Sequence, residues 1–241
     1  MSMTNLRSGS ALMASRRGVL AGLAAGAAVL TGGRLARAAC LTTAYQIDGP
    51  FYPLVLPAEQ DADLTRLAGQ SSGAAGQVIE VVGQVRDGGC RPLPGCLVEI
   101  WQADTHGRYA DPRDEPRGRP LDPNFQGYAR MATGADGSYR FRTIKPGSYL
   151  AIGDWVRPPH IHFKIHAPFN PTLATQMYFA GDPLNEKDLL QADLSPEQRR
   201  MLQVSFEEKR ADGTPVGRFD LVLADGWAAP PEIAQRFGLG G

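Results

Sequence analysis

The sequence alternates most regularly in the stretch His160-Ile161-His162-Phe163-Lys164-Ile165-His166. Apolar residues occupy every second position, and successive side chains of a β-strand point to opposite faces. The stretch therefore predicts a strand with one face in a core and with its histidines and lysine on the other face. A half-buried strand of this kind indicates a sheet that packs against a second layer.

Short runs of the same character lie on both sides of this stretch, separated by turns rich in glycine and aspartate. We expect further strands at Val78–Val85, Leu97–Trp101, Tyr139–Thr143, Thr175–Phe179, Val204–Glu208 and Gly217–Leu223. The turn signal at 87–89 predicts that the first two of these strands form a hairpin.

A single short helix is expected after Ser195, where Pro196 and Gln198 complete the pattern of a capping box. Many short strands, one helix and no internal repeat are typical of an all-β protein. The sequence thus predicts a single β-sandwich domain with a short helix and an extended amino-terminal arm.

The composition favours a small-molecule partner. The chain has 241 residues, and 25 basic residues balance 25 acidic ones. This balance gives no electrostatic footprint for nucleic acid or for an anionic membrane.

The amino terminus has the pattern of an export signal. Arg16 and Arg17 precede an apolar run from Val19 to Leu30, and small residues surround Ala38. The paired arginines are typical of a twin-arginine signal peptide, although an ordinary secretory signal or an uncleaved anchor would share most of the pattern. We therefore expect a signal peptide at 1–38, an arm at 39–75, the core at 76–225, a tail at 226–241, and a periplasmic or extracellular location.

Three cysteines, Cys40, Cys90 and Cys96, would then lie in an oxidising compartment, where one disulfide is expected. Cys96 begins an alternating strand, as a buried free thiol would. Cys40 with Cys90 is the preferred pair, but the sequence alone leaves the pairing open.

Three of the four histidines lie on one face of the 160–166 strand. Residues two apart on a strand are separated by roughly 7 Å along the backbone, so the imidazoles of His160 and His162 can reach one metal ion. A solvated strand face with incidental histidines is the alternative, and a metal site needs more ligands than these two.

Five motifs in sequence order resemble those of the intradiol ring-cleavage dioxygenases. They are Gly49–Tyr52, Glu99–Asp104 with Gly107 and Tyr109, Thr143–Tyr149, Arg157–Phe163 and Thr175–Phe179. The similarity extends from Gly49 to Leu223 and is greatest to the protocatechuate 3,4-dioxygenase subunits, particularly the iron-bearing β type. The helical domain that precedes the sandwich in catechol 1,2-dioxygenases has no counterpart in this chain.

The resemblance implies that Tyr109, Tyr149, His160 and His162 bind non-haem ferric iron together with a solvent hydroxide. Two phenolate oxygens favour the ferric state, and two neutral imidazoles add no charge. The implied reaction opens a catechol-type ring between its two hydroxyl-bearing carbons and adds both atoms of O2, giving a muconate-type diacid.

The resemblance also implies further catalytic roles. Tyr149 is the ligand that substrate displaces, Arg157 stabilises negative charge on the substrate ring, and Gln176 is a polar residue beside the site. Tyr52 is expected to line the substrate entrance or to pack nearby. His106 and His166 match no ligand position, and a homo- or hetero-oligomer is expected.

The stretch between Tyr149 and His160 is short for the protocatechuate enzymes, which leaves the aromatic substrate open. Two other classes of protein remain as alternatives. One is an exported transthyretin-like or carbohydrate-binding β-sandwich without catalysis. The other is a zinc or ferrous enzyme in which Asp104 or Asp154 completes the histidine pair.

Overall fold

The computed structural model describes residues 40–167 and 170–224. The predicted signal peptide and the predicted tail at 226–241 lie outside these ranges. None of the helices within the described ranges is long and apolar enough to cross a membrane.

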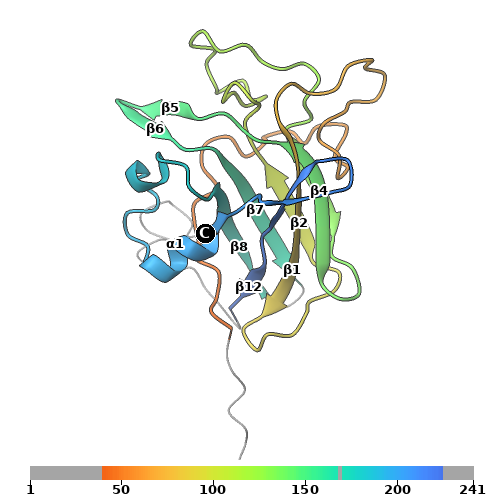
Figure 1. Ribbon diagram of the computed structural model, residues 1–241, viewed down its shortest axis with the longest axis vertical. Helices are drawn as coiled ribbons and strands as arrows, with labels where there is room; N and C mark the ends of the chain where they lie inside the picture. The colour runs from red at the N-terminus through yellow and green to blue at the C-terminus, as the bar shows by residue number, and fades with distance from the viewer. Residues whose placement is uncertain (1–39, 168–169, 225–241) are drawn as a thin grey trace, which may run out of the picture. The chain divides into compact units, whose positions relative to one another are not determined.

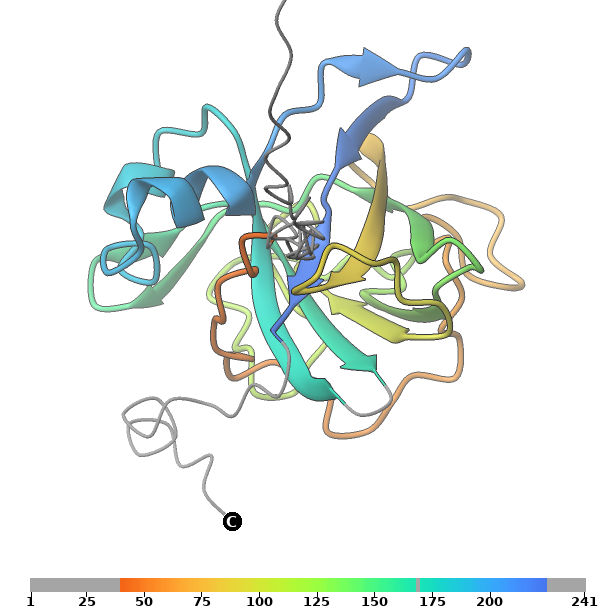
Figure 2. The same ribbon diagram turned by 90° about the horizontal axis from the view of Figure 1, so that it is seen from below.

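Two five-stranded sheets make up the domain. The first contains β1 (Val78–Asp87), β4 (Ser138–Ile144), β10 (Glu208–Lys209), β11 (Pro215–Arg218) and β12 (Leu221–Leu223). The second contains, in spatial order, β3 (Tyr128–Ala132), β2 (Leu97–Trp101), β7 (His160–Ala167), β8 (Asn170–Phe179) and β9 (Gln203–Val204). The predicted β-sandwich is confirmed, and Figure 1 and Figure 2 show the two sheets facing each other.

Three smaller elements lie outside the two sheets. They are the hairpin of β5 (Tyr149–Ile152) and β6 (Trp155–Arg157), the 3-10 helix η1 (Asn185–Lys187) and the helix α1 (Pro196–Leu202). Ser195 and Gln198 form the predicted capping box at the start of α1. The β5–β6 hairpin lies on the same side of the molecule as α1 (Figure 1).

The core between the sheets is built from the apolar face of the alternating stretch that predicted it. Ile161, Phe163 and Ile165 of β7 are fully buried. The Phe163 ring lies 5.8 Å from the ring of Phe141 and 5.0 Å from that of Phe219, both of which belong to the opposite layer. The alternation thus decides which face of β7 is core and leaves the histidines on the outer face.

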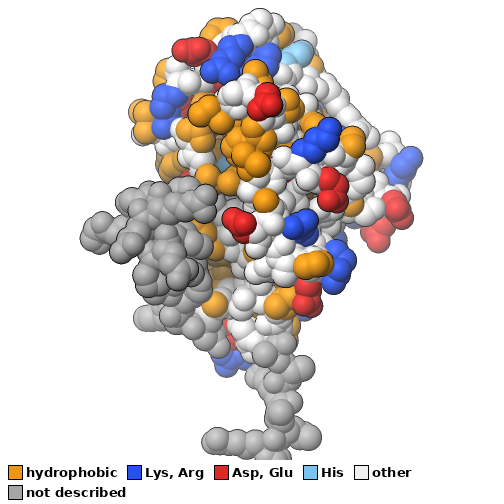
Figure 3. All heavy atoms as spheres, turned by 90° about the vertical axis from the view of Figure 1, so that its left-hand side faces the viewer, with side chains coloured by type: hydrophobic (Ala, Val, Ile, Leu, Met, Phe, Trp, Pro, Cys, Tyr) orange, Lys and Arg blue, Asp and Glu red, His pale blue; other side chains and the backbone are white. Residues whose placement is uncertain are grey.

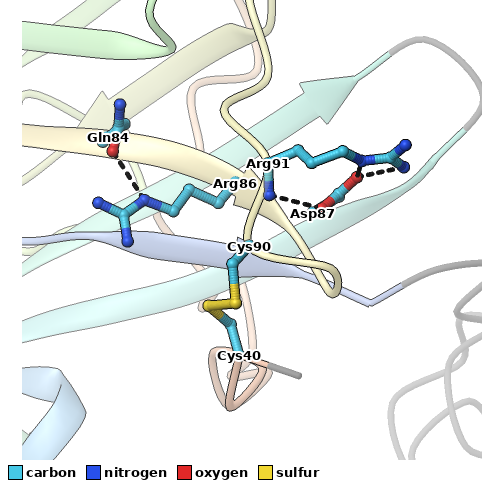
Figure 4. Close-up of a disulfide and its surroundings, with 6 residues drawn as sticks. All are labelled: Cys40, Gln84, Arg86, Asp87, Cys90 and Arg91. Carbon is cyan, nitrogen blue, oxygen red and sulfur yellow. Dashed lines mark hydrogen bonds and ion pairs between the residues drawn. A yellow bond between two sulfur atoms is a disulfide. The ribbon is translucent and has the colours of Figure 1, made fainter. Parts of the chain in front are cut away.

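The amino-terminal residues of the described chain cross this outer face in extended form. Gln46 donates a backbone hydrogen bond to Ala174 of β8, and the amide of Gln176 donates to the Ile47 carbonyl. Cys40 forms a disulfide with Cys90 in the turn after β1, as preferred from the sequence (Figure 4). Cys96 is buried and free. The arm is therefore tied to both layers of the sandwich.

The predicted hairpin of the first two strands is wrong, because β1 and β2 belong to different sheets. After the turn, the returning chain makes one isolated bridge to β1, between Pro92 and Arg86. Proline has no backbone N–H to continue a ladder, and Pro94 follows two residues later. The chain consequently leaves β1 and crosses to the second sheet.

The last two predicted strands are also discontinuous. Between β9 and β10 the chain crosses from one sheet to the other, and the Phe206 ring stacks on Phe179 at 5.1 Å. Between β11 and β12 the Asp220 side chain accepts the N–H of Gln84, in place of a backbone acceptor. In both places the interaction of a side chain accompanies a break in a strand that the sequence predicted to be continuous.

Candidate active site

The two candidate histidines lie at the start of β7 and are buried. Their ring centroids are 4.9 Å apart. The Nδ1 atom of His160 lies 2.7 Å from the carbonyl oxygen of Pro158, so Nδ1 donates and Nε2 keeps its lone pair. His160 is thereby oriented as a ligand for a metal ion.

The two candidate tyrosines are placed by loops that touch. Gly107 precedes Tyr109 by two residues, and Gly147 stands at the same distance before Tyr149. A Cβ on Gly147 would lie 2.5 Å from the Gly107 nitrogen, and one on Gly107 would lie 2.3 Å from the Ser148 carbonyl oxygen. Only glycine permits this approach, which brings the tyrosine rings to a centroid distance of 5.7 Å.

All four predicted ligands converge on one point. The Tyr109 hydroxyl lies 3.3 Å from Nε2 of His160. The Tyr149 ring is 5.7 Å from the His160 ring, and the Tyr109 ring is 6.3 Å from the His162 ring. One strand, one hairpin and one loop therefore bring together residues that are up to 53 positions apart in the sequence.

Burial lowers the pKa of the two histidines and raises the pKa of the two tyrosines. Burial, and then the charge of Arg157, hold the pKa of His160 and of His162 well below the usual value, so both imidazoles are neutral. Burial likewise raises the pKa of Tyr109 and of Tyr149. In the protein alone the phenols keep their protons, and an adjacent highly charged cation would reverse that preference.

The residues present fit a ferric ion. Donor atoms about 2.0–2.1 Å from one ion at a tetrahedral angle lie about 3.3 Å apart, the separation of the Tyr109 oxygen and the His160 nitrogen. The buried Nδ1 of His162 has no hydrogen-bond partner among the described side chains and backbone. Phenolate oxygens with imidazole nitrogens are a donor set for a hard trivalent cation.

The described part of the chain offers no carboxylate that completes a metal site with the histidine pair. Residues 40–167 and 170–224 contain no cluster of three or more His, Cys, Asp or Glu that could hold a metal ion. Asp104 is buried, but its carboxylate accepts the backbone N–H groups of His106, Arg108 and Asp122. The zinc or ferrous alternative thus loses Asp104 as a candidate ligand, and Asp154, its other candidate, is exposed in the turn between β5 and β6.

Arg157 lies beside the four candidate ligands at the end of β6. Its Nε donates to Asp188 at 3.1 Å, and its Nη2 donates to the Gln176 oxygen at 2.7 Å. Burial alone lowers the pKa of this guanidinium, but the fields of Tyr178 and Asp188 outweigh it and raise the pKa above its usual value. Gln176 and Asp188 therefore hold a permanent positive charge in place next to Tyr149.

Four residues around the site had no assigned role in the sequence-based prediction. Trp101 stacks on His162 with its ring 4.7 Å away and nearly parallel. The others are Tyr178, Gln46 and Asp188. The Tyr178 hydroxyl donates a hydrogen bond to the Gln46 side chain and accepts one from Arg157, and Asp188 accepts another from Arg157. Trp101 and Tyr178 lie within the quoted motifs, and the β-pairing of Trp101 with His162 and of Tyr178 with His160 would have predicted their positions.

Tyr52 packs behind the site and does not line the entrance. Its hydroxyl donates to Glu99, and its ring meets Trp101 edge-on at 5.0 Å. Glu99 also accepts from Tyr128 and contacts His166. Phe51 takes the position at the entrance that Tyr52 was expected to hold.

A cavity of about 370 Å³ opens onto these residues. Tyr149 and Arg157 line its inner end, and among the four ligands Tyr149 is the one that reaches its wall. The remaining lining comes from the arm at 47–51, the loop at 113–119, the β5–β6 hairpin and Leu190. The arrangement places a neutral phenol and a fixed cation where a small molecule enters.

Comparison with known proteins identifies the family of this chain. The family described as Dioxygenase matches residues 47–225. The chain is 41% identical to the protocatechuate 3,4-dioxygenase beta chain of Burkholderia cepacia, over 71% of this chain and 75% of that one. It is 31% identical to the hydroxyquinol 1,2-dioxygenase of Nocardioides simplex, over 64% of this chain and 57% of that one, so it spans little more than half of the latter's length.

Among solved structures, the dioxygenase domain of a dioxygenase carbohydrate-binding protein fusion from Streptomyces sp. SirexAA-E aligns with a TM-score of 0.56 and 35% identity. The alignment covers 76% of this chain and 98% of that one. The matched part of that protein is its dioxygenase domain, which favours catalysis over the carbohydrate-binding alternative. The fold, the converging side chains and these similarities lead to one conclusion: the chain belongs to the intradiol ring-cleaving dioxygenase family.

Proposed function

We propose that this protein binds ferric iron through Tyr109, Tyr149, His160 and His162 and cleaves catechol-type rings between the two hydroxyl-bearing carbons. One observation carries the proposal: two phenols and two neutral imidazoles converge beside a cavity whose inner wall is Tyr149 and Arg157. Both atoms of O2 would enter the product, a muconate-type diacid.

A ferric ion bound there would supply Lewis acidity and a redox couple that make a catecholate reactive toward O2. The chain's own residues do the rest. Tyr149 is the ligand nearest the substrate, so its oxygen is placed to take up a proton from an incoming diol hydroxyl. Tyr109, His160 and His162 lie deeper and hold their positions.

Arg157 has an electrostatic role. Negative charge develops on the substrate ring during cleavage, and a preorganised cation stabilises such charge strongly in a water-excluded site. Gln176 accepts from the guanidinium and donates to the Ile47 carbonyl, so it fixes Arg157 relative to the arm. The apolar residues Pro50, Phe51 and Leu190 on the cavity wall limit the access of water.

The test is a visible spectrum of the iron-loaded protein followed by an oxygen-uptake assay with catechol. Tyrosinate bound to ferric iron gives an intense red-brown charge-transfer band, which Tyr109→Phe and Tyr149→Phe should weaken. Arg157→Leu should retain the band and the iron while lowering kcat. A protein that binds iron without this band, or whose band survives both tyrosine substitutions, contradicts the proposed ligand set.

We also propose that the chain is exported through a twin-arginine pathway to the periplasm or beyond, as Arg16 and Arg17 indicate. The Cys40–Cys90 disulfide supports an oxidising compartment. Fractionation of cells that express the wild-type chain and the Arg16→Lys, Arg17→Lys double variant tests this proposal, since the variant should remain in the cytoplasm. Oligomerisation is proposed from the family alone, and light scattering of the purified protein would measure it.

A further inference from the structure

Part of the lining of the active-site cavity consists of exposed or half-buried apolar side chains. Leu150, Ile152, Trp155 and Leu190 line it, and we refer to these four residues as the apolar trough. Leu150 is 44% exposed and Ile152 is 73% exposed, although both are large hydrophobic residues. Figure 3 looks onto the side of the molecule that carries β5 and β6, and hydrophobic side chains gather there in one patch. An exposed apolar surface that continues an active-site cavity is a candidate binding surface.

The cavity is larger than a bare diol needs. Its volume of about 370 Å³ falls within the range of roughly 300–1,000 Å³ that is typical of sites for drug-sized ligands. Catechol is a single ring and would occupy only the inner end, near Tyr149 and Arg157. The trough would then remain in contact with water unless the substrate carries a further group.

The charges around the cavity argue against a carboxylate as that group. Arg113 forms an ion pair with Asp111 at 2.5 Å, and Arg119 forms one with Asp114 at 2.7 Å. Arg157 is held by Asp188, as described above. Each of these three arginines is therefore already paired with a carboxylate of the chain itself.

Arg117 is the remaining arginine of the described lining. It lies 3.8 Å from Glu115, and both side chains are largely exposed. An exposed ion pair contributes little binding free energy because water and salt screen it. A substrate carboxylate at this exposed rim would therefore gain little from Arg117, because water and salt would screen the attraction.

We propose that the preferred substrates are catechols with an extended apolar substituent, alkyl or aryl, that lies along the apolar trough, and that Ile152 and Leu150 determine this specificity. The inference rests on the proposed ring-cleaving function. It separates this chain from a strict protocatechuate enzyme, whose substrate carries a carboxylate at the same position of the ring.

The experiment measures kcat/KM by oxygen uptake for catechol, 4-methylcatechol, 4-butylcatechol and protocatechuate with the iron-loaded protein. Each fully buried methylene is worth about fourfold. Three further methylenes, about half buried in the trough, should raise kcat/KM roughly tenfold from the methyl to the butyl compound. Protocatechuate should be a poorer substrate than 4-butylcatechol. Anaerobic titration of the visible band gives the dissociation constants of the same series without turnover.

Ile152→Ser should lower the butyl-to-methyl ratio by roughly threefold or more, and Leu150→Ser should act in the same direction. Leu54→Ser is the matched control, because Leu54 is 72% exposed and does not line the cavity. It should leave the ratio at the wild-type value.

The outcomes separate the two proposals. Three results would overturn the apolar trough as a specificity site: kcat/KM that does not change along the alkyl series, a preference for protocatechuate over 4-butylcatechol, or a butyl-to-methyl ratio of kcat/KM that neither trough variant changes. Cleavage of catechol would still support the proposed function in each case. A preference for protocatechuate that Arg117→Ala abolishes would assign the rim to carboxylate recognition. If no diol in the series is cleaved and no charge-transfer band forms, the proposed function itself fails.

Discussion

Replacing Asp188 by asparagine should separate the positioning of Arg157 from the binding of iron. The two carboxylate oxygens lie 3.1 and 3.2 Å from the guanidinium nitrogens, and both side chains are buried. At these distances and an effective dielectric constant near 20, the attraction between the two charges is about 5 kcal/mol. Removal of one partner of a buried pair costs about 3–5 kcal/mol, because the other charge remains without compensation.

Asparagine retains one oxygen that can accept from Nε, so we expect a loss in the free energy of unfolding of about 3 kcal/mol, at the lower end of that range. An unrestrained Arg157 should also move relative to the substrate ring. A displacement of about 1 Å can cost about 100-fold in rate, so kcat should fall by roughly 10- to 100-fold. KM should change less, because the apolar residues of the cavity wall keep their side chains.

Urea unfolding, steady-state kinetics and the visible spectrum of the iron-loaded variant measure the three effects. Asp188 contacts none of the four ligands, so the charge-transfer band should persist. Asp193→Asn is the control, because it makes the same substitution at an exposed carboxyl in the same segment. If Asp188→Asn keeps both wild-type kcat and wild-type stability, Arg157 is not held by this ion pair.

Three further predictions concern residues that stabilise the fold around the candidate site. Burial raises the pKa of Glu99, but hydrogen bonds from Tyr128, His166 and Tyr52 outweigh it and hold the pKa below the usual value. The ionised carboxylate therefore contributes stability above about pH 4.3, and this contribution is lost as the pH falls through the lower folded-state pKa. In urea titrations, the difference in unfolding free energy between wild type and Glu99→Gln should narrow from pH 7 to about pH 3. A difference that widens would contradict the lowered pKa. Cys90→Ser removes the disulfide that closes a loop with a sequence separation of 50, so it should lower the free energy of unfolding by up to about 4 kcal/mol. Reduction of the wild-type disulfide with dithiothreitol should lower the free energy of unfolding by the same amount, and a smaller effect would point to another cause of the loss in the variant. Gly147→Ala places a methyl group 2.5 Å from the Gly107 nitrogen and should lower the free energy of unfolding by about 1–3 kcal/mol. The variant should also bind less iron per chain, as measured by mass spectrometry. Gly134→Ala is the control and should keep its iron, because the nearest atom to its added methyl group is 3.3 Å away.

The parts of the fold that sequence predicted well are those that depend on local pattern. The alternation from His160 to His166 gave both the buried face of β7 and the shared face of the histidine pair. The capping box at Ser195 is likewise decided within four residues. Strand pairing is not local: β1 and β2 are separated by a tight turn, yet Pro92 and Pro94 send the chain to the other sheet.

The site divides in the same way. The geometry of one strand predicts that His160 and His162 share a face, but nothing in the spacing of the chain predicts that Tyr109 and Tyr149 meet them. That convergence depends on the contact between Gly107 and Gly147, and the two tyrosines were identified by the family resemblance. Asp188 lies in an irregular segment between β8 and α1, where no periodicity marks a buried partner for Arg157.

The division between strand and loop has a functional consequence. His162 pairs with β2 on one side and with β8 on the other, and His160 pairs with β8, so the sheet fixes the positions of both histidines. The apolar trough, by contrast, belongs largely to the β5–β6 hairpin, which pairs with no other strand of the described chain. Substitutions at Leu150 or Ile152 can therefore change what the cavity accepts without moving the histidines. Among the four candidate ligands, Tyr149 alone belongs to both parts, because it is the first residue of β5, and it would couple the choice of substrate to the proposed iron site.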